Sequence, residues 1–292
     1  MIKVLFFNAF TFINEKSNID LNTGFERTID MNHFNKMRLA VLFCSLSVLI
    51  ILSACGSDET DGEEEFVTLT ISAAASLTNA LEAAADVFHE SHPEIKADFN
   101  FGGSGALRQQ ISQGAPADLF FSASESDFNT LIDNGSIAEE NSVNLLRNDL
   151  VLVTPAGSDN VTSFNDITKA DQIAVGTPES VPAGKYSMQT FNSLGIKEDI
   201  EPLLVYAEDV RAVLTYVERG EVDAGLVYRT DALTSDKVEI ADTAEKDLHE
   251  PIVYPAGLIT ESENAEAAEI FYEFLQSEEA LTIFEDYGFT RE

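Results

Sequence analysis

The most constraining feature of this sequence is a strand, turn and helix unit that occurs twice between residues 67 and 122. The run from Val67 to Ile71 is rich in β-branched residues, and three alanines lie just before Ser76, where apolar residues begin to recur at helical spacing. Residues 95–101 alternate as a strand and lead to a Gly-Gly-Ser-Gly turn around Ser104, where a second helix begins. The pattern predicts a βαβ arrangement with a serine at each helix start.

A helix N-terminus presents unpaired backbone N–H groups and the positive end of the helix dipole, and both attract anions. Ser76 and Ser104 would add two hydroxyl donors to such a site. A lone serine at this position is most often an ordinary N-cap that binds nothing except its own helix. Because the pattern occurs twice in one βαβ arrangement, we favour a binding site over two independent caps.

The second half of the chain repeats the arrangement. A buried strand at 173–176 leads to a helix start at Ala183, and a strand at 203–206 leads to a helix start near Val210. Alanine and valine carry no side-chain donor, so either could bind an anion only through its backbone N–H. Tyr228 ends an apolar strand, which is where ligands bind in open α/β sheets. A half-buried strand aromatic is an equally good interpretation of Tyr228 from the sequence alone.

Length and charge narrow the class of protein. The chain of 292 residues is 45% hydrophobic, which is enough for two α/β lobes. It carries 17 Lys and Arg against 51 Asp and Glu, for a net charge of −34. Nucleic acid is therefore disfavoured as a partner, because no basic patch exists to neutralise phosphates. The acidity favours a solvated surface suited to a salty or alkaline medium, and an anion would have to be bound by local donors.

Residues 1–54 are typical of targeting signals rather than of a fold. Two basic residues precede an apolar run that ends in Leu-Ser-Ala-Cys, a lipobox that predicts lipidation of Cys55. We expect a lipoprotein signal peptide at residues 31–54, and a start codon assigned too early that makes residues 1–30 an extension. Residues 55–65 are small and acidic and predict a disordered tether. The apolar run is too short for a spanning helix.

Several catalytic and metal motifs are missing from the sequence. Cys44 lies in the signal peptide and Cys55 is the expected lipidation site, which leaves no free thiol in the mature chain for a thiolate metal site or a cysteine nucleophile. The turn around Ser104 lacks the glycine spacing of a nucleophile elbow. His89 and His92 stand one residue too close for a metalloprotease helix. We predict a protein without enzymatic activity, cofactor or direct cation ligands.

Short motifs spread along the chain also carry a family resemblance: Ala73-Ala74-Ala75-Ser76-Leu77-Thr78-Asn79-Ala80, Phe101-Gly102-Gly103-Ser104-Gly105, Gly114-Ala115-Pro116-Ala117-Asp118-Leu119-Phe120, Val181-Pro182-Ala183-Gly184, Ala207-Glu208-Asp209-Val210-Arg211, Gly225-Leu226-Val227-Tyr228 and Tyr287-Gly288-Phe289-Thr290. With them the sequence from about Phe66 onward closely resembles the molybdate-binding proteins of ABC-type importers.

The resemblance implies a two-lobed α/β fold of the type II periplasmic binding protein kind. Each lobe would be a mixed sheet flanked by helices, and two strands would cross between the lobes. Residues 66–147 and 254–292 would form lobe 1, and residues 148–253 would form lobe 2. In this family the bound oxyanion is held by two serines, the backbone of an alanine and a valine, and a tyrosine hydroxyl. Motif by motif, these roles fall on Ser76, Ser104, Ala183, Val210 and Tyr228, which would hold molybdenum as molybdate.

The resemblance further implies an extracytoplasmic lipoprotein that captures molybdate, and tungstate with it, and delivers it to the membrane permease subunits of an ABC importer. We expect a monomer anchored to the outer face of the cell membrane through Cys55. None of the five residues offers a carboxylate to accept a proton, so the site would disfavour hydrogen phosphate. Molybdate, tungstate and sulfate all satisfy this requirement, and the resemblance alone selects molybdate.

Other functions remain open from the sequence. The same fold could bind sulfate, another oxyanion or a ferric-ion complex. A ligand-sensing regulator is disfavoured because the lipobox directs the chain out of the cytoplasm, and an enzyme is disfavoured because no nucleophile or acid/base pair accompanies the turns. Arg211 could clamp an anion through its guanidinium, but its place beside Glu208 and Asp209 favours an ion pair within the protein.

Overall fold

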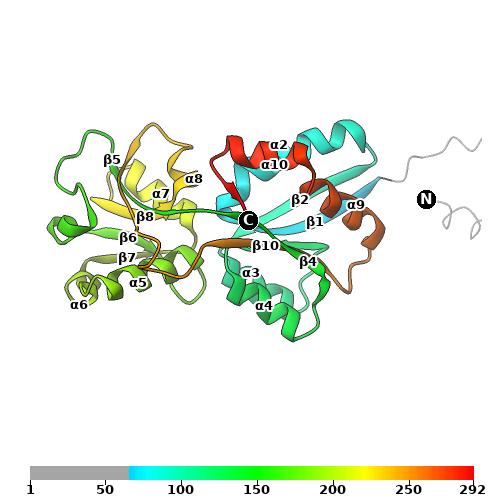
Figure 1. Ribbon diagram of the computed structural model, residues 1–292, viewed down its shortest axis with the longest axis horizontal. Coiled ribbons are helices and arrows are strands. Elements are labelled where there is room, and N and C mark those ends of the chain that lie inside the picture. Colours follow the sequence, from blue (N-terminus) through cyan, green and yellow to red (C-terminus); the bar gives the residue numbers. More distant parts are fainter. Residues whose placement is uncertain (1–65) are drawn as a thin grey trace, which may run out of the picture. The chain divides into compact units, whose positions relative to one another are not determined.

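The computed structural model of the protein describes residues 66–292, which form two sheets with helices on their faces (Figure 1). The predicted extension at 1–30, the signal peptide at 31–54, Cys55 and the acidic tether lie outside the described residues. Within residues 66–292, none of the helices has the length and apolar character needed to cross a membrane.

The first sheet has six strands in the order β11-β4-β10-β3-β1-β2. β1 pairs in parallel with β2 and β3, whereas β10 runs antiparallel to β3 and β4, so the sheet is mixed. The elements of this lobe, which we call lobe 1, are β1 (Val67–Ala74), η1 (Ala75–Leu77), α2 (Thr78–Ser91), β2 (Ile95–Gly102), α3 (Ser104–Ser112), β3 (Leu119–Phe121), α4 (Glu125–Asp133), β4 (Ile137–Arg147), β10 (Val253–Ile259), α9 (Ala265–Leu275), α10 (Glu278–Asp286) and β11 (Thr290–Arg291).

The second sheet has five strands in the order β7-β6-β8-β5-β9. β6 pairs in parallel with β7 and β8, and β5 runs antiparallel to β8 and β9. The elements of this lobe 2 are β5 (Leu150–Pro155), η2 (Phe164–Lys169), β6 (Ile173–Gly176), α5 (Pro182–Ser193), α6 (Lys197–Ile200), η3 (Glu201–Leu203), β7 (Leu204–Ala207), α7 (Val210–Glu218), β8 (Ala224–Tyr228), α8 (Arg229–Ala232) and β9 (Val238–Thr243).

The two sheets share one topology in their parallel parts. In lobe 1, β1, β2 and β3 lie in the order β3-β1-β2, with α2 and α3 in the connections. In lobe 2, β6, β7 and β8 lie in the order β8-β6-β7, with α5 and α7 in the connections. Parallel strands linked by crossovers end at the same edge of a sheet. Each lobe therefore presents its strand-to-helix turns along one edge.

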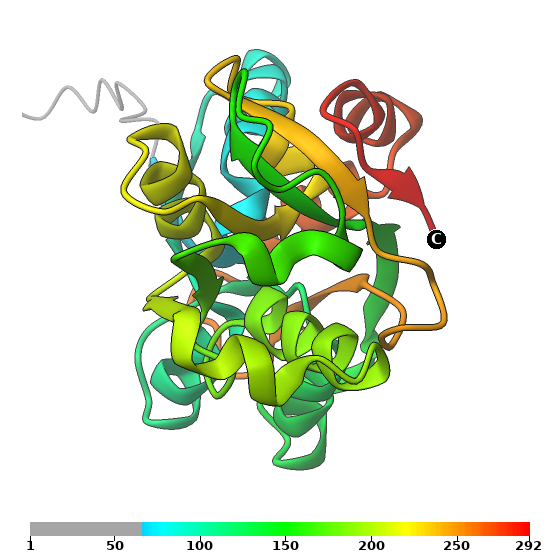
Figure 2. The same cartoon turned by 90° about the vertical axis from the view of Figure 1, so that its left-hand side faces the viewer.

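The helices pack on the sheets through apolar stripes at helical spacing. The stripe of α7 contacts β8 at Gly225, where an added Cβ would lie only 2.7 Å from a methyl of Val217 and 3.0 Å from one of Val213. A glycine is thus required for α7 to lie this close to the sheet. Figure 2 shows helices on both faces of the sheets. This packing fixes the position of the α7 N-terminus relative to β8.

The chain crosses between the lobes twice, side by side (Figure 1). It first passes from β4 to β5 through Asn148 and Asp149, and it returns through residues 244–252 to β10. The buried hydrophobic residues form one large cluster that includes both lobes and a smaller cluster around Leu107, Phe120 and Phe128. The apolar interior is therefore continuous from one lobe to the other.

Candidate functional site

A small cavity of about 10 Å³ lies where the turns of the two lobes meet. All five residues predicted from the sequence line it. The complete lining is Ala74, Ala75, Ser76, Gly102, Gly103, Ser104, Ala123, Val181, Pro182, Ala183, Val210 and Tyr228. Residues from six strand-to-helix junctions are thereby gathered around one space.

Each predicted residue stands at a strand-to-helix junction. Ser76 lies in η1, the single 3-10 turn that leads into α2, and Ser104 is the first residue of α3. Ala183 and Val210 occupy the first turns of α5 and α7, and Tyr228 is the last residue of β8. The first N–H groups of a helix have no partner within the helix, so these turns offer backbone donors to the cavity.

A close approach of two backbones places the N-terminus of α5. A Cβ on Gly184 would lie 2.0 Å from the carbonyl oxygen of Gly176, at the end of β6. No side chain fits in that space. The glycine therefore lets α5 begin directly over the end of the strand, which puts the N–H of Ala183 beside the cavity.

The two serines are not N-caps, contrary to the ordinary interpretation of serine at such a position. Neither α2 nor α3 has a side-chain hydrogen bond at its N-terminus. The hydroxyl of Ser104 instead accepts a hydrogen bond from the N–H of Ala123 at 2.9 Å, and the hydroxyl of Ser76 bonds that of Tyr254 at 2.9 Å. Both serine side chains are buried. Their hydroxyls are thus anchored from outside the helices that they precede.

Tyr228 carries a buried polar atom that nothing satisfies. Its side chain is 1% exposed, and its hydroxyl has no hydrogen-bond partner within residues 66–292. Burial raises the pKa of Tyr228 well above its ordinary value, so the hydroxyl keeps its proton. A buried donor without a partner costs free energy. Its place in the cavity lining shows where an acceptor would be stabilising.

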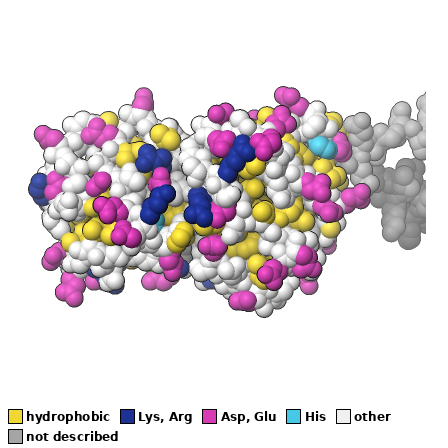
Figure 3. Space-filling view, viewed as in Figure 1, with side chains coloured by type: hydrophobic (Ala, Val, Ile, Leu, Met, Phe, Trp, Pro, Cys, Tyr) yellow, Lys and Arg dark blue, Asp and Glu magenta, His cyan; other side chains and the backbone are white. Residues whose placement is uncertain are grey.

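The cavity lining contains no charged side chain among the described residues. No group of three or more His, Cys, Asp or Glu within residues 66–292 could hold a metal ion. Figure 3 shows acidic side chains scattered over one face of the molecule, with the Lys and Arg side chains mostly near its middle. The site itself therefore consists of hydroxyls, backbone N–H groups and apolar walls.

The lobes contact each other directly around the cavity. The N–H of Gly105 in α3 donates to the carbonyl of Ser180 in lobe 2 at 3.0 Å. A Cβ on Gly105 would lie 2.9 Å from the Cα of Ser180, and one on Gly103 would lie 2.6 Å from its carbonyl oxygen. The Gly-Gly-Ser-Gly turn thus lets the backbones of the two lobes meet.

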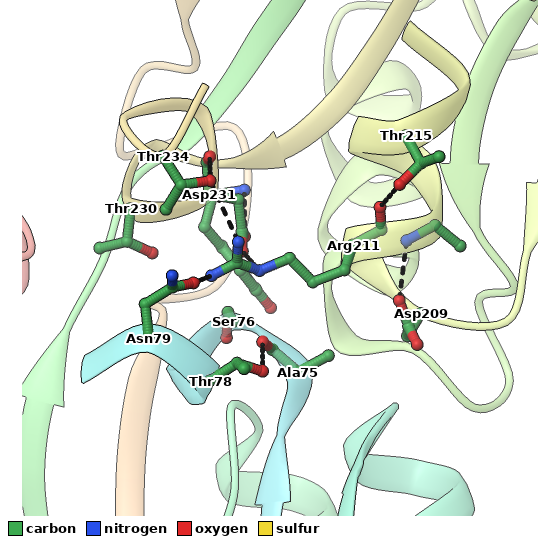
Figure 4. Close-up of polar contacts among 12 residues, drawn as sticks. Ala75, Ser76, Thr78, Asn79, Asp209, Arg211, Thr215, Thr230, Asp231 and Thr234 are labelled. Carbon is green, nitrogen blue, oxygen red and sulfur yellow. Dashed lines mark hydrogen bonds and ion pairs between the residues drawn. The ribbon is translucent and has the colours of Figure 1, made fainter. Parts of the chain in front are cut away.

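Arg211 makes a second contact between the lobes (Figure 4). It reaches from α7 to Asn79 in lobe 1, where its guanidinium donates to the amide oxygen at 2.7 Å. Its Nε also lies 2.8 Å from a carboxylate oxygen of the fully buried Asp231, as an ion pair without hydrogen-bond alignment. Arg211 therefore pairs with Asp231 and not with its sequence neighbours Glu208 and Asp209. The other oxygen of Asp231 accepts from the N–H of Tyr228 at 3.3 Å.

Three residues around the site escaped the sequence analysis: Asn148, Asp231 and Tyr254. Tyr254 bonds Ser76 across 178 positions of sequence, and Asn148 bonds Tyr254 at 3.3 Å. From the sequence, Tyr254 is placed only at the start of the second segment of lobe 1, residues 254–292. A single polar residue at a strand end carries no local signal of such a contact.

Residues 69–290 match the profile of the bacterial extracellular solute-binding protein family. The match covers most of the chain, and the chain therefore belongs to this family. Because the family binds solutes, membership confirms the prediction that the protein is not an enzyme.

Individual relatives agree with this assignment. The chain is 48% identical over 258 residues to YvgL of Bacillus subtilis, provisionally named an ABC transporter substrate-binding lipoprotein, covering 87% of this chain and 99% of the relative. It is 37% identical to the molybdate-binding protein ModA of Escherichia coli, covering 76% and 88%. A solved structure from Clostridium difficile, provisionally described as the substrate-binding domain of a molybdenum ABC transporter, is 40% identical with a TM-score of 0.61, covering 77% and 99%. The predicted family resemblance and fold class are confirmed.

The buried carboxyl of Asp231 predicts a pH dependence of stability. Burial raises its pKa from 3.8 to about 6, against the opposing effects of Arg211 and of the Tyr228 N–H. Between these values the folded protein holds a proton that the unfolded chain releases, so this group favours folding more as the pH falls. We expect it to add about 1 kcal/mol to the free energy of unfolding between pH 7 and pH 5.

The measurement is urea denaturation of the wild type and of Asp231→Asn at both pH values. The variant has no carboxyl to protonate, so its free energy of unfolding should rise less than that of the wild type over this interval. Equal changes in the two proteins would show that Asp231 does not titrate here. The variant also loses stability because Arg211 has no partner. Comparing the change in free energy of unfolding between the two pH values, rather than its absolute value, cancels this loss.

Proposed function

We propose that this protein captures molybdate, and tungstate with it, in the cavity between its lobes and delivers it to the permease of an ABC importer. The observation that carries the proposal is the buried, unpartnered hydroxyl of Tyr228 facing the same cavity as Ser76 and Ser104. The names of the relatives at 37% and 40% identity point to the same ligand class.

A dianion needs no cation in such a site. Hydrogen bonds to a charged group contribute about 1.5 to 3 kcal/mol each. Three hydroxyls and the backbone N–H groups of several helix starts would together replace the hydration shell of the ion. The uncharged walls also avoid the cost of burying a counter-charge. Tetrahedral oxyanions without a proton suit this set of donors because every ligand oxygen is an acceptor.

A ferric-ion complex fits the cavity less well than an oxyanion. Iron binding by protein alone would need several carboxylate, imidazole or phenolate ligands, and the described lining offers only the phenol of Tyr228. Sulfate satisfies the same hydrogen-bond requirement as molybdate and is the second candidate. The two ions differ in size, so measured affinities distinguish them.

The contacts between the lobes support capture by closure. Ser76 and Ser104 belong to lobe 1, whereas Ala183, Val210 and Tyr228 belong to lobe 2. An ion that bridges both sets interacts fully only when the lobes are together, so binding favours the closed arrangement. Lipidation at Cys55 would hold the protein at the outer face of the membrane, next to the permease. The relative at 48% identity bears the name of a lipoprotein.

Calorimetry of the purified protein with molybdate, tungstate, sulfate and hydrogen phosphate tests the proposal. Molybdate and tungstate should bind one ion per protein molecule, and sulfate should bind more weakly. Tighter binding of sulfate than of molybdate would assign the site to sulfate instead. Absence of heat with all four ions would reject an oxyanion site.

Loss of either serine hydroxyl should weaken molybdate binding. We expect Ser76→Ala and Ser104→Ala each to cost roughly 1 to 3 kcal/mol, the usual cost of leaving a buried hydrogen-bonding group without its partner. Ser122→Ala is the matched control, because the buried hydroxyl of Ser122 bonds only the backbone of Ser124. Calorimetric affinities of both site variants equal to that of the control would remove the serines from the site.

An added methyl at Gly105 should hinder closure. Its Cβ would lie 2.9 Å from the Cα of Ser180 across the cleft, and overpacking of this kind costs about 1 to 3 kcal/mol. We expect Gly105→Ala to lower molybdate affinity about tenfold. Alanine favours the helix, so stability without ligand should not fall. Gln109→Ala, on the exposed side of the same helix, is the control and should leave the molybdate affinity unchanged. Equal molybdate affinities in Gly105→Ala and Gln109→Ala would argue against tight closure at Gly105.

A further inference from the structure

Tyr254 is fully buried on β10 and does not line the cavity, yet its hydroxyl lies directly behind the site. On one side it is 2.9 Å from the hydroxyl oxygen of Ser76, and on the other it is 3.3 Å from the side-chain nitrogen of Asn148. Three polar groups thus form a short chain from the first crossing between the lobes to the cavity.

The orientation of Asn148 is fixed by its other contacts. Its amide oxygen accepts from the N–H of Asp149 at 2.9 Å, and its amide nitrogen donates to the hydroxyl of Thr230 at 2.8 Å. The nitrogen is therefore the atom that faces Tyr254. An amide nitrogen donates and cannot accept, so Tyr254 must be the acceptor in that bond.

The direction of the next bond follows from the first. A tyrosine hydroxyl that accepts from Asn148 has its own proton left to donate, and Ser76 is its remaining partner within residues 66–292. Burial raises the pKa of Tyr254 well above its ordinary value, so this proton stays in place. Ser76 accepts from Tyr254, and its own proton is free to point into the cavity.

The hydroxyl of the other serine, Ser104, also accepts a hydrogen bond from within the protein, but from a backbone N–H. The N–H of Ala123 donates to the hydroxyl oxygen of Ser104, so that serine also keeps its proton for the cavity. Each hydroxyl oxygen thus has one lone pair occupied by a fixed donor, and in this arrangement its own proton has no acceptor among the described residues, so a ligand in the cavity would be its partner. If either serine accepted a proton from a ligand, its own proton would be left without an acceptor, which is costly for a buried group.

We propose that Tyr254 and Asn148 are positioning residues that set the hydrogen-bond direction of Ser76 and so make the site reject oxyanions that carry a proton. The inference rests on the proposed oxyanion-binding function and adds a determinant of its selectivity. Neither residue would touch the ligand. They act through Ser76. While the hydrogen bonds from Asn148 through Tyr254 to Ser76 are intact, the Ser76 hydroxyl donates to the ligand, and once they are broken it can donate or accept.

Sulfate and hydrogen phosphate are the probes that isolate this effect. The two ions are close in size and, at about pH 8, have the same charge, but only the phosphate carries a proton. The ratio of their affinities therefore reports on acceptors in the site and is insensitive to general damage to the cavity. Both affinities are measured by displacement of molybdate.

Tyr254→Phe breaks the chain and keeps the ring, which packs edge to face against Tyr228 and Phe289. Ser76 then has both lone pairs free and is no longer held in one orientation, so it can more readily accept a proton from the ligand. We expect molybdate affinity to fall several-fold. The ratio of sulfate affinity to hydrogen phosphate affinity should fall tenfold or more. Tyr186→Phe is the control: its hydroxyl is buried nearby but bonds the carbonyl of Ala123, so its loss should leave the preference unchanged.

Asn148→Asp tests the direction itself. A carboxylate accepts where the amide donated, so Tyr254 would donate to it and accept from Ser76, which reverses the chain. The added charge repels both dianions alike, and the preference for sulfate should again narrow, here by tenfold or more.

Three outcomes decide between the two proposals. The inference is supported if the ratio of sulfate affinity to hydrogen phosphate affinity falls in Tyr254→Phe and Asn148→Asp but not in Tyr186→Phe. If the wild type binds molybdate while the preference of both variants stays within twofold of the wild type, the inference is wrong and the proposed function stands. If the wild type binds none of these ions, the proposed function falls and the inference falls with it.

Discussion

Hydrogen-bond donors held in a fixed direction around an uncharged space are the constraint on which the rest of this structure depends. The lining offers hydroxyls and backbone N–H groups, and no side-chain charge, among the described residues. A buried donor is stabilised only by an acceptor, and here the Tyr228 hydroxyl has none. The folded protein thus maintains an unsatisfied donor in the cavity lining. Such groups are costly unless the missing partner arrives from solution.

The topology of the two sheets creates that place. Each lobe contributes parallel strands in the same relative order, and the strands end at an edge from which the helices begin. Glycines then allow the closest approaches: Gly184 brings α5 onto the end of β6, and Gly105 brings α3 against Ser180 of the other lobe. Larger residues at these positions would separate the groups that the strand order brings together. Chain topology sets the meeting point, and the glycines set its dimensions.

The sequence indicated the strand-to-helix turns well because their signals are local. Strand alternation, helical spacing and small residues place Ser76 and Ser104 correctly at helix starts. The role of the two side chains was harder to predict, because a serine N-cap and a serine anchored elsewhere have the same local sequence. Ala183 and Val210 came from the family resemblance alone, since a backbone donor leaves no mark on the side chain. The role of Tyr254 could not be predicted from the sequence, because its hydrogen bond to Ser76 joins distant segments of the chain.

The net charge of −34 sets a further condition on any anion that enters. At a distance the protein repels a dianion, and screening over about 8 Å at physiological ionic strength limits this repulsion to the near surface. Lys and Arg side chains lie mostly near the middle of one face, whereas acidic side chains are spread over it (Figure 3). Arg211, next to Val210, is held by Asp231 and Asn79 rather than by the cavity. Its charge is balanced by that of Asp231, so attraction and selectivity are left to the neutral donors, which distinguish ligands by their protons and their size.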